Sequence, residues 1–112
     1  MENDACDLRD RRCGPCTKST PPLDVERADE LHQLVPDWAM DQGRLQREFT
    51  FRDFATALTF VNRVGDLAEA EGHHPDILLH RWKRVTLTLT THAIGGLSEN
   101  DFIVAAKIDA ML

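Results

Sequence analysis

The chain has 112 residues, of which 42% are hydrophobic and 29% are charged, and its formal net charge is −6 at pH 7. This length suits one domain with a single modest core. No apolar run approaches the roughly 20 residues that span a bilayer, and the charged N-terminus lacks the apolar stretch of a secretory signal. The acidic balance argues against a nucleic-acid surface, which needs clustered Lys and Arg. We expect a cytoplasmic protein that binds neither membrane nor nucleic acid.

Residues 1–21 are polar and charged and end in Thr-Pro-Pro, which predicts a flexible N-terminal arm before a domain over 22–112. The three cysteines, Cys6, Cys13 and Cys16, all lie in this arm, and their odd number disfavours a closed disulfide framework. Cys13 and Cys16 have redox-motif spacing, but a thioredoxin-type pair needs a strand before it and a helix after it. We therefore expect reduced thiols of unassigned role.

The first half of the domain predicts a helix followed by a hairpin. Asp24 can cap a helix that runs to about Leu34 and ends before Pro36. The segment that follows has Asp41-Gln42-Gly43 as a turn between two short apolar runs, the second from Leu45 to Phe51. This pattern is typical of two antiparallel strands.

The longest helix is expected from Asp53, which can cap it, to about residue 71, where Gly72 can end it. Two sets of apolar residues lie side by side along it at helical spacing: Phe54, Leu58, Val61 and Ala68, and Ala57, Phe60, Val64 and Leu67.

Two strands and a helix should complete the chain. A short strand near 77–79 precedes a strand over 84–91, in which aliphatic and threonine side chains alternate. Ser98 and Asp101 form a variant of the capping box before a helix over 102–111. The element order predicts an α+β architecture, with helices on one face of an antiparallel sheet.

Three histidines lie where these elements end. His73 and His74 follow the long helix, and His92 follows the long strand. Imidazole is the side chain best suited to proton transfer near neutral pH. Glu69 lies four residues before His73, so both can share one face of the last helical turn. Asp101, in the first turn of the final helix, could orient an imidazole across the preceding turn.

Two rival chemistries use the same residue types. His73, His74 and His92 could supply three nitrogens to a catalytic zinc. Pro75 favours extended backbone at His74, however, so the adjacent imidazoles should diverge. A Cys-His nucleophile is disfavoured because the thiols lie in the arm. We expect no metal.

The spacing of these residues resembles the active-site signature of the pterin-4a-carbinolamine dehydratases. The pattern reads Glu69, three residues, His73-His74-Pro75, six residues, Trp82, nine residues, His92, eight residues, Asp101. The similarity continues over 91–109 and, more loosely, back to Pro22. It implies a four-stranded antiparallel sheet with three helices packed on one face, usually assembled as a homotetramer.

The resemblance also implies an activity. A 4a-hydroxytetrahydrobiopterin dehydratase, a hydro-lyase, converts 4a-hydroxytetrahydropterin (the 4a-carbinolamine) to quinonoid dihydropterin, and so recycles the pterin cofactor of aromatic amino-acid hydroxylases. Pterin is then the substrate, and no cofactor is needed. By resemblance, His73 and His92 form the acid/base pair and His74 binds and polarises the substrate. The remaining expected site residues bind or orient: Glu69, Pro75, Asp76, Trp82 and Asp101.

A second hypothesis is a non-catalytic binding or assembly protein. Members of this fold act as dimerisation partners of transcription factors or as assembly chaperones for the carbon-fixing carboxylase. The intact signature favours the enzyme, because a scaffold does not need three positioned imidazoles.

Overall fold

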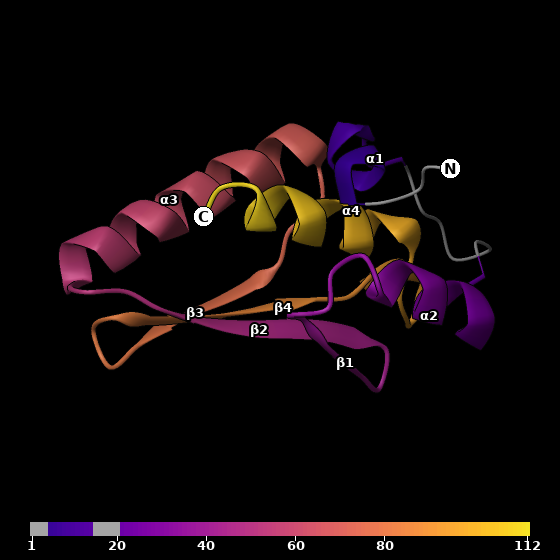
Figure 1. Cartoon of the computed structure of the whole chain (residues 1–112), viewed down its shortest axis with the longest axis horizontal. Coiled ribbons are helices and arrows are strands. Elements are labelled where there is room, and N and C mark those ends of the chain that lie inside the picture. The colour runs from indigo at the N-terminus through magenta and orange to yellow at the C-terminus, as the bar shows by residue number, and fades with distance from the viewer. Residues whose placement is uncertain (1–4, 15–20) are drawn as a thin grey trace.

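The computed structural model describes residues 5–14 and 21–112, with the backbone alone for residues 5–7. It contains one four-stranded antiparallel sheet in the order β1-β2-β4-β3. Helices lie over one face of this sheet (Figure 1). The predicted α+β fold, with a four-stranded antiparallel sheet and three helices packed on it, is confirmed. The elements in chain order are α1 (Ala5–Asp10), α2 (Val25–His32), β1 (Ala39–Asp41), β2 (Arg44–Thr50), α3 (Phe54–Glu71), β3 (Asp76–His80), β4 (Arg84–Leu89), η1 (His92–Ile94) and α4 (Glu99–Asp109).

Local side-chain chemistry sets the ends of the long helix. The Asp53 carboxylate accepts a hydrogen bond from the Thr56 backbone N–H at 2.8 Å, which satisfies a donor that the first turn leaves unpaired. Gly72 ends the helix in the left-handed conformation, with φ of 65°. Both predicted ends of α3 are therefore confirmed.

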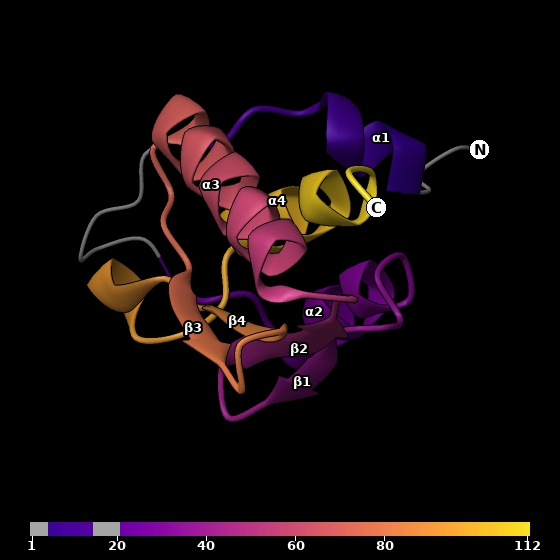
Figure 2. The same cartoon turned by 90° about the vertical axis from the view of Figure 1, so that its left-hand side faces the viewer.

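The strands divide into a buried and an open face. Val85, Leu87 and Leu89 of β4 are fully buried beneath the helices, while the threonines between them point to the other side. No described element covers that side of the sheet in either cartoon (Figures 1 and 2). The alternation predicted from the sequence thus decides which face of the sheet the helices cover.

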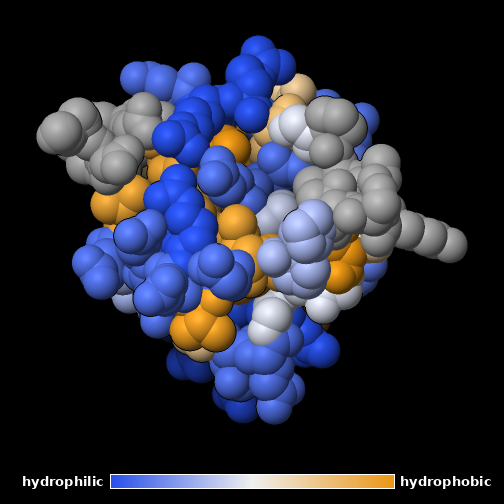
Figure 3. All heavy atoms as spheres, turned by 90° about the vertical axis from the view of Figure 1, so that its right-hand side faces the viewer, coloured by the Kyte–Doolittle hydropathy of each residue, from blue (hydrophilic) through white to orange (hydrophobic). Residues whose placement is uncertain are grey.

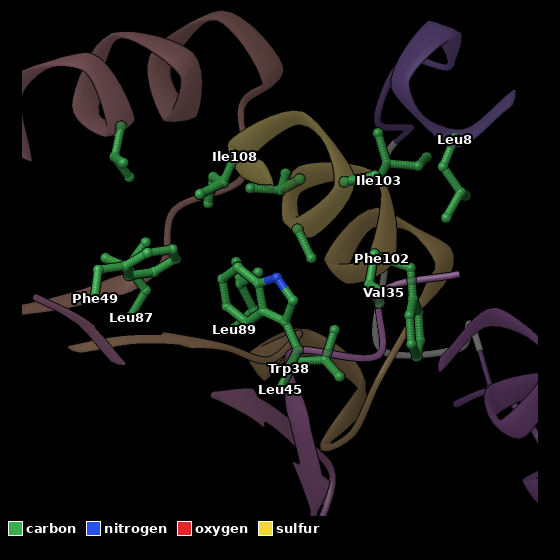
Figure 4. Close-up of a cluster of buried hydrophobic side chains, with 14 of the residues drawn as sticks. Leu8, Val35, Trp38, Leu45, Phe49, Leu87, Leu89, Phe102, Ile103 and Ile108 are labelled. Carbon is green, nitrogen blue, oxygen red and sulfur yellow. The ribbon is translucent and has the colours of Figure 1, made fainter. Parts of the chain in front are cut away.

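The core lies between the sheet and α4. In Figure 4 the Trp38 ring lies between Leu45 on β2 and Ile108 on α4, and its exposed fraction is 1%. Its indole N–H donates to the Asp109 carboxylate at 2.9 Å, and Arg47 donates to the same oxygen at 2.7 Å. The buried ring therefore keeps a partner for its polar atom.

Two apolar positions of α3 lie outside its buried stripe. The stripe that faces the core consists of Ala57, Phe60, Val64 and Ala68. Phe54 and Leu58 are instead 49% and 40% exposed. The helix presents a second apolar stripe beside the buried one, and only one of the two fits against the sheet.

Helix α1 was not predicted from the sequence. The sequence predicts a flexible arm here, whereas α1 packs against α4, with which it makes its main contacts. Leu8 is 1% exposed and lies on the Ile103 side of α4 (Figure 4). Arg11 extends the contact through an ion pair with Glu99 at 2.9 Å. A single buried leucine in a charged segment gave too weak a periodic signal to predict a helix.

The described helices include none that is both long and apolar enough to cross a membrane. At the end of the molecule that carries α2, hydrophilic side chains cover most of the surface and apolar ones form small separate patches (Figure 3).

Leu8→Ala should lower the free energy of unfolding by about 2–5 kcal/mol, because it leaves a cavity where α1 meets α4. Asp10→Ala, at an exposed position of the same helix, should change it by less than about 0.5 kcal/mol. Urea denaturation of both variants measures the difference. Equal stabilities would contradict the inclusion of α1 in the cooperative core.

Candidate active site

The end of α3 places two adjacent histidines at the edge of the sheet. After Gly72 the chain leaves the helix, and the His73 backbone N–H donates to the Ala68 carbonyl at 3.2 Å. Three residues later β3 begins at Asp76. The left-handed turn at Gly72 thus directs the two imidazoles toward different elements.

His73 is paired with a buried carboxylate. Its Nε2 lies 2.6 Å from Asp101 Oδ1, and the two side chains are 12% and 0% exposed. A carboxylate accepts, so the ring donates through Nε2–H, and Nδ1 remains as the nitrogen that can exchange a proton. The pair joins the end of α3 to the first turn of α4.

The second Asp101 oxygen is also occupied. Oδ2 accepts from the Thr91 hydroxyl at 2.8 Å and from the Ser98 backbone N–H at 3.0 Å. The Thr91 and Ser98 hydroxyls lie 2.8 Å apart. Because the Thr91 proton goes to the carboxylate, Ser98 donates to Thr91. The cap of α4 therefore holds the carboxylate that orients His73.

His92 is positioned through its neighbour Thr91. It begins η1 and is exposed, and within the described residues its ring makes no hydrogen bond to another side chain. The Thr91 backbone N–H donates to the Gly96 carbonyl at 3.0 Å, which closes the turn that carries His92. Asp101 thus binds His73 directly and also binds the hydroxyl of Thr91, the residue before His92.

The expected pairing of Glu69 with His73 is wrong. Glu69 instead lies 2.5 Å from His74 Nε2, because the turn at Gly72 moves His73 off the helical face. The side chains of His74 and Glu69 are 60% and 79% exposed, so solvent screens this pair far more than the buried one. The expected divergence of the adjacent imidazoles is confirmed, since they bind carboxylates on different helices.

All three histidines line one cleft of about 410 Å³. Its walls come from four separate parts of the chain: Gly14; Gly72, His73 and His74; Thr90, Thr91, His92 and Ala93; and Asn100. Asp101 lies directly behind His73. The structure therefore brings together four of the residues singled out from the sequence.

Other expected site residues lie outside this cleft. Glu69 and Pro75 border a neighbouring groove between α3 and β3, which His74 also touches. Asp76 is an exposed first residue of β3. Trp82 is 63% exposed in the turn after β3, at the other end of that strand from His74. In the single chain the structure does not bring Trp82 to the histidines.

Sequence reasoning missed three residues that shape the cleft. Thr91 and Asn100 carried no motif of their own, and Gly14 was assigned to the arm. Ser98 was identified as a helix cap, but its link to His73 through Asp101 was not. The capping pattern was the available signal, because it fixed where the Asp101 carboxylate must lie. Among the residues that the structure describes, no three His, Cys, Asp or Glu side chains are grouped to hold one metal ion.

Sequence comparison identifies the family to which this chain belongs. The family described as pterin 4 alpha carbinolamine dehydratase has a sequence model that matches residues 21–111 of this chain. The chain belongs to the pterin-4-alpha-carbinolamine dehydratase family.

Bacterial relatives match over nearly the full length. A candidate pterin-4-alpha-carbinolamine dehydratase of Chlorobium limicola is 50% identical over 105 residues, which cover 90% of this chain and 92% of that protein. A family member of the same description from Rubrobacter xylanophilus is 46% identical over 106 residues, covering 94% and 98%.

Solved structures of the family share the fold. The crystal structure of a transcriptional coactivator/pterin dehydratase from Brucella melitensis has a TM-score of 0.75 at 30% identity, and covers 80% of this chain and 97% of that one. A pterin dehydratase-like protein identified as a RuBisCO assembly factor in the alpha-carboxysome has a TM-score of 0.55 at 27% identity, covering 66% and 84%.

Beside the cleft, a second buried carboxylate joins α3 to α4. Glu71 is 5% exposed and binds Lys107 Nζ at 2.5 Å, and it accepts from the Cys13 backbone N–H at 2.9 Å. Burial opposes ionisation of Glu71, but the hydrogen bonds from Lys107 and Cys13 outweigh it and lower its pKa. Burial, with Glu71 adding to it, raises the pKa of the Cys13 thiol to about 12.

Cys13 should react slowly with iodoacetamide at pH 8, because only the thiolate is nucleophilic. A rise from 9.0 to about 12 lowers the thiolate fraction by about a thousandfold. Peptide mapping by mass spectrometry should show alkylation of Cys13 at least about a hundredfold slower in native than in denatured protein. Glu71→Gln should speed the native reaction; equal native and denatured rates would contradict the environment described.

Proposed function

We propose that the chain dehydrates 4a-hydroxytetrahydropterin to quinonoid dihydropterin by histidine acid/base catalysis. The observation that carries the proposal is the cleft that three imidazoles share, one of them held by the fully buried carboxylate of Asp101. Membership of the family supplies the substrate class. The pterin bicycle suits a cleft of this size, which lies within the usual range for small-molecule sites.

The reaction needs two proton movements and no change of oxidation state. The C4a–O bond breaks as a proton reaches the departing hydroxyl, N5 loses its proton, and a C4a=N5 double bond forms with release of water. One imidazole must donate and another must accept. In the proposal His73 and His92 serve these two steps, and His74 binds and polarises the pterin. No metal or further cofactor takes part.

The surroundings of His73 and His92 support the roles proposed for them. A carboxylate behind His73 fixes which nitrogen carries the proton and stabilises the imidazolium that forms if the ring takes up another. His92 is exposed at the cleft, where a substrate can reach it. In this proposal a cytoplasmic aromatic amino-acid hydroxylase supplies the 4a-hydroxypterin.

His73→Ala and His92→Ala should each lower the rate of 4a-carbinolamine dehydration by about 10²- to 10⁴-fold, the usual contribution of one positioned acid or base. The double variant should lose little more than the worse single one, because both groups act on one transition state. The decay of the carbinolamine absorbance with purified protein measures the rate.

His80→Ala is the matched control, since His80 lies at the far end of β3 and binds Thr86 Oγ1 at 3.0 Å. It should keep the wild-type rate. If the two cleft variants fold and turn over normally while the control does not, the acid/base assignment fails.

The non-catalytic alternative has one supporting observation, the structural similarity to a protein identified as a RuBisCO assembly factor. The Brucella relative, described as a transcriptional coactivator/pterin dehydratase, has the higher TM-score, 0.75 against 0.55. A purified protein without dehydratase activity would favour the alternative.

A homotetramer is the assembly that we propose. Strand β3 is an edge of the sheet, and Ile77 and Leu78 on it are 38% and 57% exposed. Phe54 and Leu58 form the second apolar stripe on α3. An open strand edge beside exposed apolar side chains is a surface that self-association commonly buries.

Light scattering should therefore give about four times the 12.7 kDa chain mass at micromolar concentration. Leu58→Lys should reduce this mass, because a charge would enter an apolar contact. Glu26→Lys, at an exposed position of α2, should leave it unchanged. A monomeric wild-type protein would refute the tetramer.

A further inference from the structure

The segment after α1 reaches the histidine cleft. Arg11 and Cys13 pack against the rest of the chain, and Gly14 lines the cleft together with His73, His74 and His92. This segment precedes residue 21, where the match to the family model begins. One wall of the cleft is thus built from outside that matched region.

Two reciprocal hydrogen bonds fix Gly14 to α4. The Gly14 backbone N–H donates to Asn100 Oδ1 at 3.0 Å, and Asn100 Nδ2 donates to the Gly14 carbonyl at 2.7 Å. Asn100 is 8% exposed and immediately precedes Asp101, which holds His73. Consecutive residues of one helical turn therefore position the wall and the imidazole.

The segment is also fixed to α3. The Cys13 backbone N–H donates to the buried Glu71 carboxylate, which Lys107 holds from the other side. Arg12 donates to the Ala70 carbonyl at 3.4 Å. Gly14 therefore follows an anchor on α3 and makes its own on α4, so its place at the cleft is set from both helices.

Gly14 lines the cleft, and the position that a side chain would take there is open. A Cβ at this position would meet no atom within 4 Å, and the backbone is outside the left-handed region. Neither turn geometry nor close packing requires glycine here. This contrasts with Gly72, whose φ of 65° favours glycine.

We infer that Gly14 is a specificity-determining residue of the cleft: it forms the wall against which the pterin lies, and its missing side chain provides the room that the bicycle needs. The inference rests on the proposed function for the identity of the ligand. Gly14 takes no part in proton transfer, so it should affect substrate binding and leave the chemical step alone.

The test compares Gly14→Ala, Gly14→Leu and Gly14→Phe in the full chain. Larger side chains should occupy more of the space that the pterin needs beside Gly14. KM for the 4a-carbinolamine should therefore rise about 10-fold or more in the Phe variant, while kcat stays within about twofold of the wild-type value. The Kd for 7,8-dihydrobiopterin, from fluorescence titration, should rise in parallel. Denaturation should show unchanged stability for Gly14→Ala, because a Cβ at this position meets no atom within 4 Å.

Ala110→Phe is the matched control, since it adds a ring at an exposed site at the C-terminal end of α4 that neither lines the cleft nor contacts the segment with Gly14. It should leave KM and Kd unchanged. An unchanged KM in Gly14→Phe, or a fall in kcat at constant KM, would overturn the inference. If Gly14→Phe fails to fold, the Leu variant decides on the same criteria. A wild-type protein that neither turns over the carbinolamine nor binds the dihydropterin would instead refute the proposed function.

Discussion

The hydrogen-bonded carboxylate of Asp101 links the fold to the site. Its side chain is fully buried, which would be costly for an unpaired charge. Donors from three places offset that cost: the end of α3 through His73, the end of β4 through Thr91, and the cap of α4 through Ser98. The carboxylate can be buried only if all three elements meet at this point. The same interaction that begins α4 thus also fixes the geometry of the cleft.

Local sequence chemistry predicted most of the fold. Asp53 and Gly72 marked the ends of α3, and the alternation of Val85, Leu87 and Leu89 gave both the position of β4 and its buried face, because each signal acts within a few residues. Helix α1 could not be found in this way. It owes its place to Leu8 packing on α4, a contact between residues far apart in the sequence that no local pattern encodes.

Local sequence patterns likewise predicted only part of the candidate site. The spacing of His73, His74, His92 and Asp101 predicted which residues meet, since each lies at the end of a predictable element. It did not predict which carboxylate each imidazole binds, because the turn at Gly72 rotates His73 away from Glu69. The sequence also did not predict that Asn100 and Gly14 contribute to the cleft, because their pairing depends on where the N-terminal segment docks.

That docking has a consequence for the order in which the molecule assembles. The ion pair between Arg11 and Glu99 spans 88 residues, and the Gly14–Asn100 pair spans 86. Contacts of such high sequence separation carry a large loop-closure entropy and form slowly. During synthesis on the ribosome, the segment with Arg11 and Gly14 emerges before α4, on which it docks. The wall of the cleft is thus completed only after α4 has been synthesised.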